Sequence, residues 1–193
     1  MLTQLSTIKT RLGLTDIQVA DDALLTNAIK AVSARFDLEC RRTLGRTAEA
    51  IEEFDADETE LRLGCYPLET VTRFDLKSNE AEGWVAQSGV EYLIRRGCVL
   101  SLAAPLGAAS QQGRVVYTGG YVLPGTTAAA GQTPLPDDLE QAAVEQVVYW
   151  YQTRERVGVV RLWPKGGVYA QFADQDLMPS VRAALSKYER MLL

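Results

Sequence analysis

The sequence predicts an α+β protein: a small bundle of about four helices with an antiparallel β unit inserted between the second and third main helices. Two changes in the spacing of apolar residues carry this prediction. The spacing is helical up to about residue 42, strand-like from about residue 48 to 118, and helical again after residue 136. The expected domains are therefore residues 1–47 with 119–193, the helical part, and residues 48–118, the inserted β part.

Two helices are expected before the β unit. The first covers residues 2–12 and ends at Gly13, because glycine readily adopts the left-handed conformation that closes a helix. The second begins at the acidic pair Asp21 and Asp22, which suits the positive end of the helix dipole, and runs to about residue 42.

Four short runs rich in β-branched or aromatic residues predict the strands of the β unit, and turn residues such as Gly, Asn and Ser separate them. These runs are residues 61–63, 71–76, 90–94 and 114–117. Residues 119–136 then form a long connection, and loops of this length are uncommon unless they are functional or disordered.

The third main helix is expected to begin at Asp137, because Asp137 and Glu140 have the spacing of a capping box. The last helix is expected near Pro179, since proline suits the first turn of a helix. Between these helices, residues 159–172 hold two apolar runs around a Pro-Lys-Gly-Gly segment, which indicates either a hairpin or an extended arm.

Composition excludes most kinds of chemistry. The chain has no histidine, which removes His-based triads and the commonest general base and metal ligand. Cys40, Cys65 and Cys98 form no Cys-x-x-Cys pair and are expected to be reduced, buried thiols. No stretch approaches the roughly 20 apolar residues of a membrane span, so we expect a protein of a reducing cytoplasm. We expect no catalytic, metal or cofactor site.

One acidic cluster leaves an alternative open. Paired carboxylates serve glycoside hydrolysis and hard cations, but this cluster lacks the glycine and final glutamate of an EF-hand loop. A solvated acidic turn is favoured, because runs of charge are normally exposed. A small enzyme acting through the cluster stays a weaker alternative, which neutralising Asp55 and Asp57 would test. The cluster consists of Glu52, Glu53, Asp55, Asp57, Glu58 and Glu60.

Four segments carry a family resemblance. They are residues 21–25 (Asp-Asp-Ala-Leu-Leu), residues 115–139, residues 148–155 (Val-Tyr-Trp-Tyr-Gln-Thr-Arg-Glu) and residues 178–190 (Met-Pro-Ser-Val-Arg-Ala-Ala-Leu-Ser-Lys-Tyr-Glu-Arg). In this order they resemble the gp6-like head–tail connector (adaptor) proteins of tailed bacteriophages. The chain is longer than the minimal, all-helical members of that family, and the β insertion accounts for the excess.

The resemblance implies a structural role at the neck of a virion, after assembly in the host bacterial cytoplasm. Members form a ring, commonly twelve-fold, beneath the portal, extend the DNA channel and support a stopper or tail protein. The implied partners are the portal protein, a stopper or tail-completion protein and further copies of this chain, with DNA passing through unbound and no membrane contact. Another phage neck or tail-completion protein, or a small non-viral adaptor module, stays an alternative.

The candidate partner-interface residues lie in the last quarter of the chain. The charges around Arg154 suit either the end of a helix or ion pairs between subunits. Trp163 lies in a Pro/Gly-flanked segment with no helical face to cover it, and Trp is enriched at interfaces. Under the resemblance, residues from about 156 to 193 form the portal-docking element. The candidates are Arg154, Arg156, Arg161, Trp163, Tyr169, Phe172 and Tyr188.

Overall fold

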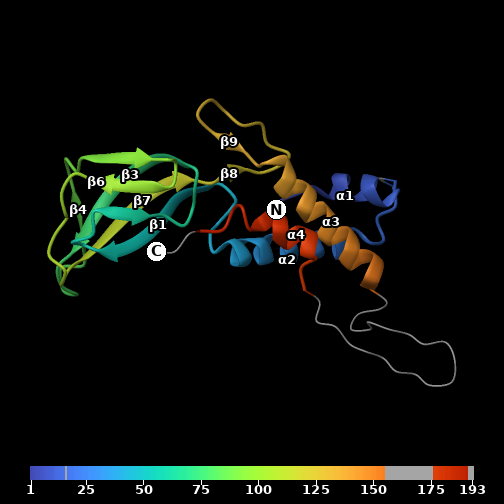
Figure 1. Ribbon diagram of the computed structural model, residues 1–193, viewed down its shortest axis with the longest axis horizontal. Coiled ribbons are helices and arrows are strands. Elements are labelled where there is room, and N and C mark those ends of the chain that lie inside the picture. Colours follow the sequence, from blue (N-terminus) through green and yellow to red (C-terminus); the bar gives the residue numbers. More distant parts are fainter. Residues whose placement is uncertain (16, 155–175, 191–193) are drawn as a thin grey trace, which may run out of the picture. The chain divides into compact units, whose positions relative to one another are not determined.

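The structure is a computed structural model that describes residues 1–15, 17–154 and 176–190. Its contacts divide the chain into two compact units. The helical unit comprises Met1–Phe36 and Pro136–Glu189, and the β unit comprises Asp37–Leu135 and Arg190–Leu193. The predicted α+β class is confirmed, with antiparallel strands between the second and third helices (Figure 1). The domain boundaries expected from the sequence stay a prediction.

Four helices are present in the described residues: α1 (Leu5–Leu12), α2 (Asp22–Cys40), α3 (Asp137–Thr153) and α4 (Pro179–Leu185). In the helical unit, α1 and α4 both pack against α3. None of the described helices has both the length and the hydropathy of a membrane-spanning segment. The core of the unit is built from Ile8, Leu25, Ile29, Val32, Phe36, Leu139, Ala143, Val147, Val181 and Leu185.

The helix ends test three sequence predictions. Gly13 closes α1 in the left-handed conformation with φ 70°, and Pro179 lies in the first turn of α4, so both predictions are confirmed. The predicted capping box at α3 is wrong. The N-cap position is occupied by Pro136, which makes no side-chain hydrogen bond to the helix. Asp137, the residue expected at that position, is instead the first residue of the helix. Glu140 instead accepts a hydrogen bond from the Thr3 hydroxyl at 3.4 Å.

Two antiparallel sheets and one short parallel pair form the described β unit. The four-stranded sheet has the order β1-β7-β3-β4, with bounds Thr47–Asp55, Gln112–Gly119, Leu68–Lys77 and Trp84–Gln87. The three-stranded sheet has the order β2-β6-β5, with bounds Glu60–Arg62, Val99–Leu102 and Tyr92–Arg95. The parallel pair, β8 (Tyr121–Val122) and β9 (Thr133–Pro134), lies within the connection that the sequence marked as long.

The two antiparallel sheets share one core. It draws residues from both, so the sheets pack face to face as a small sandwich. Val115 and Tyr117 of β7 point into this core. Val116, between them, is also buried, whereas Arg114 is only partly buried. The buried cluster consists of Leu61, Leu63, Cys65, Phe74, Leu100, Leu102, Val115 and Tyr117.

The three cysteines are free thiols. Cys40 and Cys65 are buried as expected, but Cys98 is only half-buried, in the turn between β5 and β6. Burial raises the pKa of the Cys65 thiol.

Gly119 and Gly120 fit a close approach between backbone segments at the end of β7. A Cβ on Gly119 would overlap the carbonyl oxygen of Cys65 and lie 3.0 Å from that of Pro67. Gly120 has φ 98°, and its Cβ would lie 2.6 Å from the Gly45 carbonyl oxygen. Neither position has room for a side chain without movement of the backbone.

We expect Gly119→Ala to lower the free energy of unfolding by about 2–4 kcal/mol, because a rigid backbone carbonyl occupies the space of the new methyl group. Urea unfolding would measure this. Gly131→Ala is the control: its φ is 85° but nothing lies within 4 Å of a Cβ there. That variant should lose only about 1–2 kcal/mol from backbone strain. Equal losses would contradict the close packing at Gly119.

Candidate functional site

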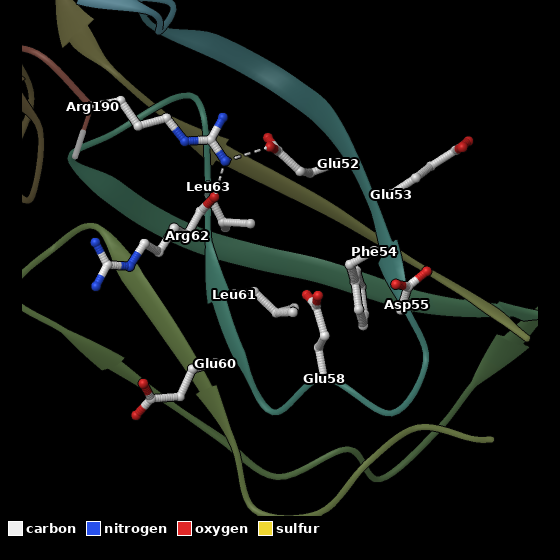
Figure 2. A pocket seen from close by; sticks show the side chains of 10 residues that line it. All are labelled: Glu52, Glu53, Phe54, Asp55, Glu58, Glu60, Leu61, Arg62, Leu63 and Arg190. Carbon is white, nitrogen blue, oxygen red and sulfur yellow. Dashed lines mark hydrogen bonds and ion pairs between the residues drawn. The ribbon is translucent and has the colours of Figure 1, made fainter. Parts of the chain in front are cut away.

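Five of the six residues of the acidic cluster, all except Asp57, line a cavity of about 490 Å³ on the β unit (Figure 2). The cavity lies between β1 and β2 and the turn that joins them, and the apolar side chains of Phe54, Leu61 and Leu63 form part of its wall. Its polar lining consists of Glu52, Glu53, Asp55, Glu58, Glu60, Arg62 and Arg190.

Most carboxylates of this cavity are open to water. Glu53, Asp55, Glu58 and Glu60 are all exposed, and Glu60 forms only an exposed ion pair with Arg95 at 3.3 Å. Carboxylates that act in catalysis are usually sheltered from water in a cleft, whereas these four side chains are exposed. The described residues also contain no group of three or more His, Cys, Asp or Glu that could hold a metal ion. The arrangement favours the solvated acidic surface.

Glu52 differs from its neighbours because its carboxylate is half-buried and binds three groups. Its Oε2 accepts hydrogen bonds from the Gly64 backbone N–H at 2.9 Å and from the Tyr117 hydroxyl at 3.3 Å. The Tyr117 oxygen in turn accepts the Cys65 N–H at 3.1 Å. Burial raises the pKa of the Tyr117 hydroxyl, and the charge of Glu52 raises it further. Glu52 therefore ties edge strand β1 to β7 and to the segment after β2.

The third group is Arg190, which sequence reasoning assigned no role. Its guanidinium lies 3.0 Å from Glu52 Oε1 and also donates to the Arg62 carbonyl, as Figure 2 shows. Its backbone N–H donates to the Cys40 carbonyl at 2.9 Å. The C-terminal segment is thus fixed to the β unit by both backbone and side chain. A separation of 138 residues between Arg190 and Glu52 leaves no local sequence signal for this pair.

Arg154, a predicted interface residue, closes α3. It is the C-cap, its guanidinium stacks 4.0 Å from the ring centroid of Tyr151, and it donates to the Tyr151 carbonyl at 2.7 Å. The Tyr151 hydroxyl donates to Asp21, and that bond raises the pKa of Tyr151. Arg154 therefore meets the need of a helix end for a positive charge, and its interface role stays a prediction.

Tyr188, the other candidate within the described residues, also has contacts inside its own unit. Its hydroxyl donates to Asp138 Oδ1 at 2.6 Å, and Lys187 lies 3.5 Å from the same carboxylate. The Tyr188 hydrogen bond holds the pKa of Asp138 below its usual range. The interface role of Tyr188 stays a prediction. Five further candidates lie outside the described residues: Arg156, Arg161, Trp163, Tyr169 and Phe172.

Comparison with known proteins gives a likeness of fold. No protein-family model and no curated protein matches the chain. A chain in the neck of an empty gene transfer agent (GTA) particle, computed with C6 symmetry, matches with a TM-score of 0.62 at 17% identity. A chain in the virion of the native GTA particle matches with a TM-score of 0.54 at 18% identity. Each match covers 98% of this chain and 90% of the other chain.

We expect Arg190→Met to lower the free energy of unfolding by about 1–2 kcal/mol, because Glu52 would lose a charged partner from a site where both side chains are about one quarter exposed. Chemical denaturation would measure the change. Arg95→Met is the control: it breaks an arginine–glutamate pair of the same unit that is more than half exposed. The control should change the free energy by no more than about 0.5 kcal/mol, and a larger loss there than at Arg190 would contradict the role of Glu52.

We expect Tyr188→Phe to raise the pKa of Asp138 toward its ordinary value, since the largest cause of its depression is removed. A depressed carboxyl pKa stabilises the fold above the unfolded pKa of about 4, and this stability is lost as the pH falls through the folded pKa. The variant should therefore be less stable at pH 7, by less than about 1 kcal/mol because Asp138 is 42% exposed, and unchanged at pH 2.

Carboxyl-carbon NMR titration and denaturation at both pH values would check this prediction. Tyr149→Phe, at a tyrosine that is 44% exposed, is the control. An unchanged Asp138 titration in Tyr188→Phe would show that the hydrogen bond is absent in solution.

Proposed function

We propose that the chain is a structural protein of the neck of a phage-like particle. It acts there as a head–tail connector, an oligomeric ring that binds the portal and extends the DNA channel toward a stopper or tail-completion protein. The likeness to a chain of the GTA neck is the observation that supports this most strongly, because it extends over 98% of this chain. The match includes helices and strands alike, so it concerns the whole architecture and not one common motif.

The symmetry of the GTA neck supports the proposed ring. A ring that obeys the C6 symmetry of the GTA neck contains six copies or a multiple of six. The twelve-fold ring implied by the family resemblance meets this condition. A closed ring also requires that each copy use two different faces, one toward each neighbour.

Charge supports a channel that does not hold DNA. The chain has a net charge of −5, and a ring of such subunits repels phosphate. DNA that must move through a channel quickly benefits from weak adhesion to its wall. We infer that DNA passes without specific binding.

We infer further that the role is not catalytic. The carboxylates of the acidic cavity are mostly exposed, which supports a solvated surface and not an acid–base pair. A different neck or tail-completion protein is the second candidate, because the likeness concerns a neck without naming the component. Binding to the portal distinguishes the two: a connector binds it directly.

Deleting the gene from the genome that encodes it tests the proposed function. Electron microscopy should then reveal heads that package DNA but lose it, beside free tails, because the joint between them is missing. Restoring the gene on a plasmid is the control. Complete infectious particles from the deletion strain would overturn the neck assignment.

Charge reversal tests the candidate interface residues. We expect Arg154→Glu with Arg161→Glu to reduce capture of the chain by purified portal rings, since both charges are proposed to face a neighbouring protein. Arg95→Glu is the matched control, at an arginine of the β unit that is 57% exposed. Undiminished capture by the double variant would remove these two residues from the interface.

A further inference from the structure

The outer strand of the three-stranded sheet presents apolar side chains to water. β5 ends the strand order β2-β6-β5, so within the described residues only one of its two sides is paired. All four of its residues are exposed. The side chain of Leu93 is 65% exposed, and those of Tyr92 and Ile94 are each 38% exposed. An apolar edge strand of this kind is a template for pairing with another strand.

The pairing of β5 with β6 shows which backbone groups of β5 are open. The two strands are antiparallel, and just before β5 the Ala103 N–H donates to the Glu91 carbonyl at 2.9 Å. Residues of an antiparallel strand alternate between those that bond to the partner strand and those that face away from it. Every second residue from Glu91 onward therefore bonds to β6. The N–H and C=O groups of Tyr92 and Ile94 face the open side.

The side chains along β5 form a pattern that is complementary to itself. Because side chains alternate along a strand, Glu91, Leu93 and Arg95 share one face of the sheet. Read in one direction this face is acidic, apolar and basic, and read in the other it is basic, apolar and acidic. Tyr92 and Ile94 share the opposite face, so both of their positions are apolar. An antiparallel copy of the same strand therefore matches charge with opposite charge and apolar with apolar.

We propose that β5 of one copy pairs with β5 of a second copy, antiparallel and centred on Leu93. Tyr92 of each copy then exchanges backbone hydrogen bonds with Ile94 of the other. Glu91 of each copy lies opposite Arg95 of the other, and the two Leu93 side chains lie against each other. The two three-stranded sheets join into one sheet with the β5 strands at its centre.

The side-chain pattern selects this register over its nearest alternatives. A shifted pairing that still uses the open backbone groups places Tyr92 opposite Tyr92, or Ile94 opposite Ile94. Leu93 then lies opposite Glu91 in the first case and opposite Arg95 in the second, so that an apolar side chain meets a charge. Cross-strand neighbours of this kind stabilise a sheet less than matched pairs do.

Both charged residues are available for a second copy. The Glu91 side chain is exposed and forms no ion pair with the described part of the chain. Arg95 uses Nη1 to reach Glu60 at 3.3 Å, in a pair whose two side chains are both more than half exposed. A guanidinium has five N–H donors, so Arg95 retains donors for a second carboxylate. Exposed ion pairs add little energy, and these charges select the register more than they strengthen the contact.

This pair is separate from the proposed ring. It uses the same strand of both copies, as two-fold dimers do, whereas neighbours in a ring meet through two different faces. A strand of four residues makes a small contact, which forms at high protein concentration. The dilute chain used for unfolding and portal capture stays single, so the Arg95 variants remain suitable controls there.

Charge reversal in the full-length chain tests the pair, with sedimentation at increasing concentration as the measurement. Glu91→Arg and Arg95→Glu should each weaken association by roughly tenfold, because each variant places like charges opposite each other twice. An equal mixture of the two variants should regain association, since one copy then has two arginines and the other has two glutamates. Arg73→Glu is the control, at an arginine of β3 that is 55% exposed, and should leave association unchanged.

Disulfide trapping tests the centre of the pair. Leu93→Cys, oxidised with copper phenanthroline, should give a cross-linked dimer. Opposite residues in this type of pair have Cα atoms about 4.5 Å apart, which a disulfide can span. Val85→Cys is the matched control, because Val85 is 50% exposed on β4, an edge strand of the other sheet. The wild-type chain controls for Cys40, Cys65 and Cys98.

Several results would overturn the pair. A wild-type chain that stays single at the highest concentration reached would do so, and would leave the open side of β5 to a strand of another protein. Association that neither charge reversal weakens, a mixture no stronger than its two components, or equal cross-linking of Val85→Cys would also overturn it.

The proposed function fails separately. A chain that pairs through β5 but whose deletion leaves complete particles would retain the pair and lose the neck assignment. A chain that is needed for the neck but stays single would retain the neck assignment and lose the pair.

Discussion

The β unit is held together at one half-buried carboxylate. Glu52 lies on β1, an edge strand that pairs within its sheet on one side only, with β7. Its carboxylate binds the backbone after β2, the Tyr117 hydroxyl of β7 and the guanidinium of Arg190. Hydrogen bonds to a charged group are stronger than neutral ones. One side chain therefore joins both sheets to the C-terminal segment, and the exposed carboxylates around it can remain in water.

The helices could be predicted because their period, their glycine stop and their first-turn proline are local signals. Strands β1, β4 and β6, and the short pair β8 and β9, were not among the predicted runs. β1 has the sequence Thr-Ala-Glu-Ala-Ile-Glu-Glu-Phe-Asp, which is poor in β-branched residues, and Glu49 within it has φ 57°. It is a strand because β7 pairs with it, which is a tertiary cause. The predicted capping box at α3 was wrong because the motif gives only the spacing between Asp137 and Glu140. The helix begins one residue earlier than that prediction requires, with Pro136 as its N-cap.

The candidate interface residues show the same limit of local sequence signals. The sequence marked Arg154 and Tyr188 as unusual, and the structure gives each a bond within the helical unit that spacing alone does not reveal. The exposed side chains of Leu38 and Ile17 were not marked, because an isolated apolar residue in a helix or loop carries no sign of whether water or protein surrounds it. Burial is a property of the folded chain, so the structure is needed to tell which apolar side chains stay exposed.

The thiols of the β unit make it suitable for spectroscopy. Thiol reagents attack the thiolate, so a buried cysteine with a raised pKa reacts slowly. Cys65 is such a residue and Cys40 is buried too, whereas Cys98 is partly open in the turn between β5 and β6. A maleimide fluorophore or spin label would therefore attach first at Cys98, without any substitution. Distances between labels on neighbouring copies would then count the subunits of the proposed ring.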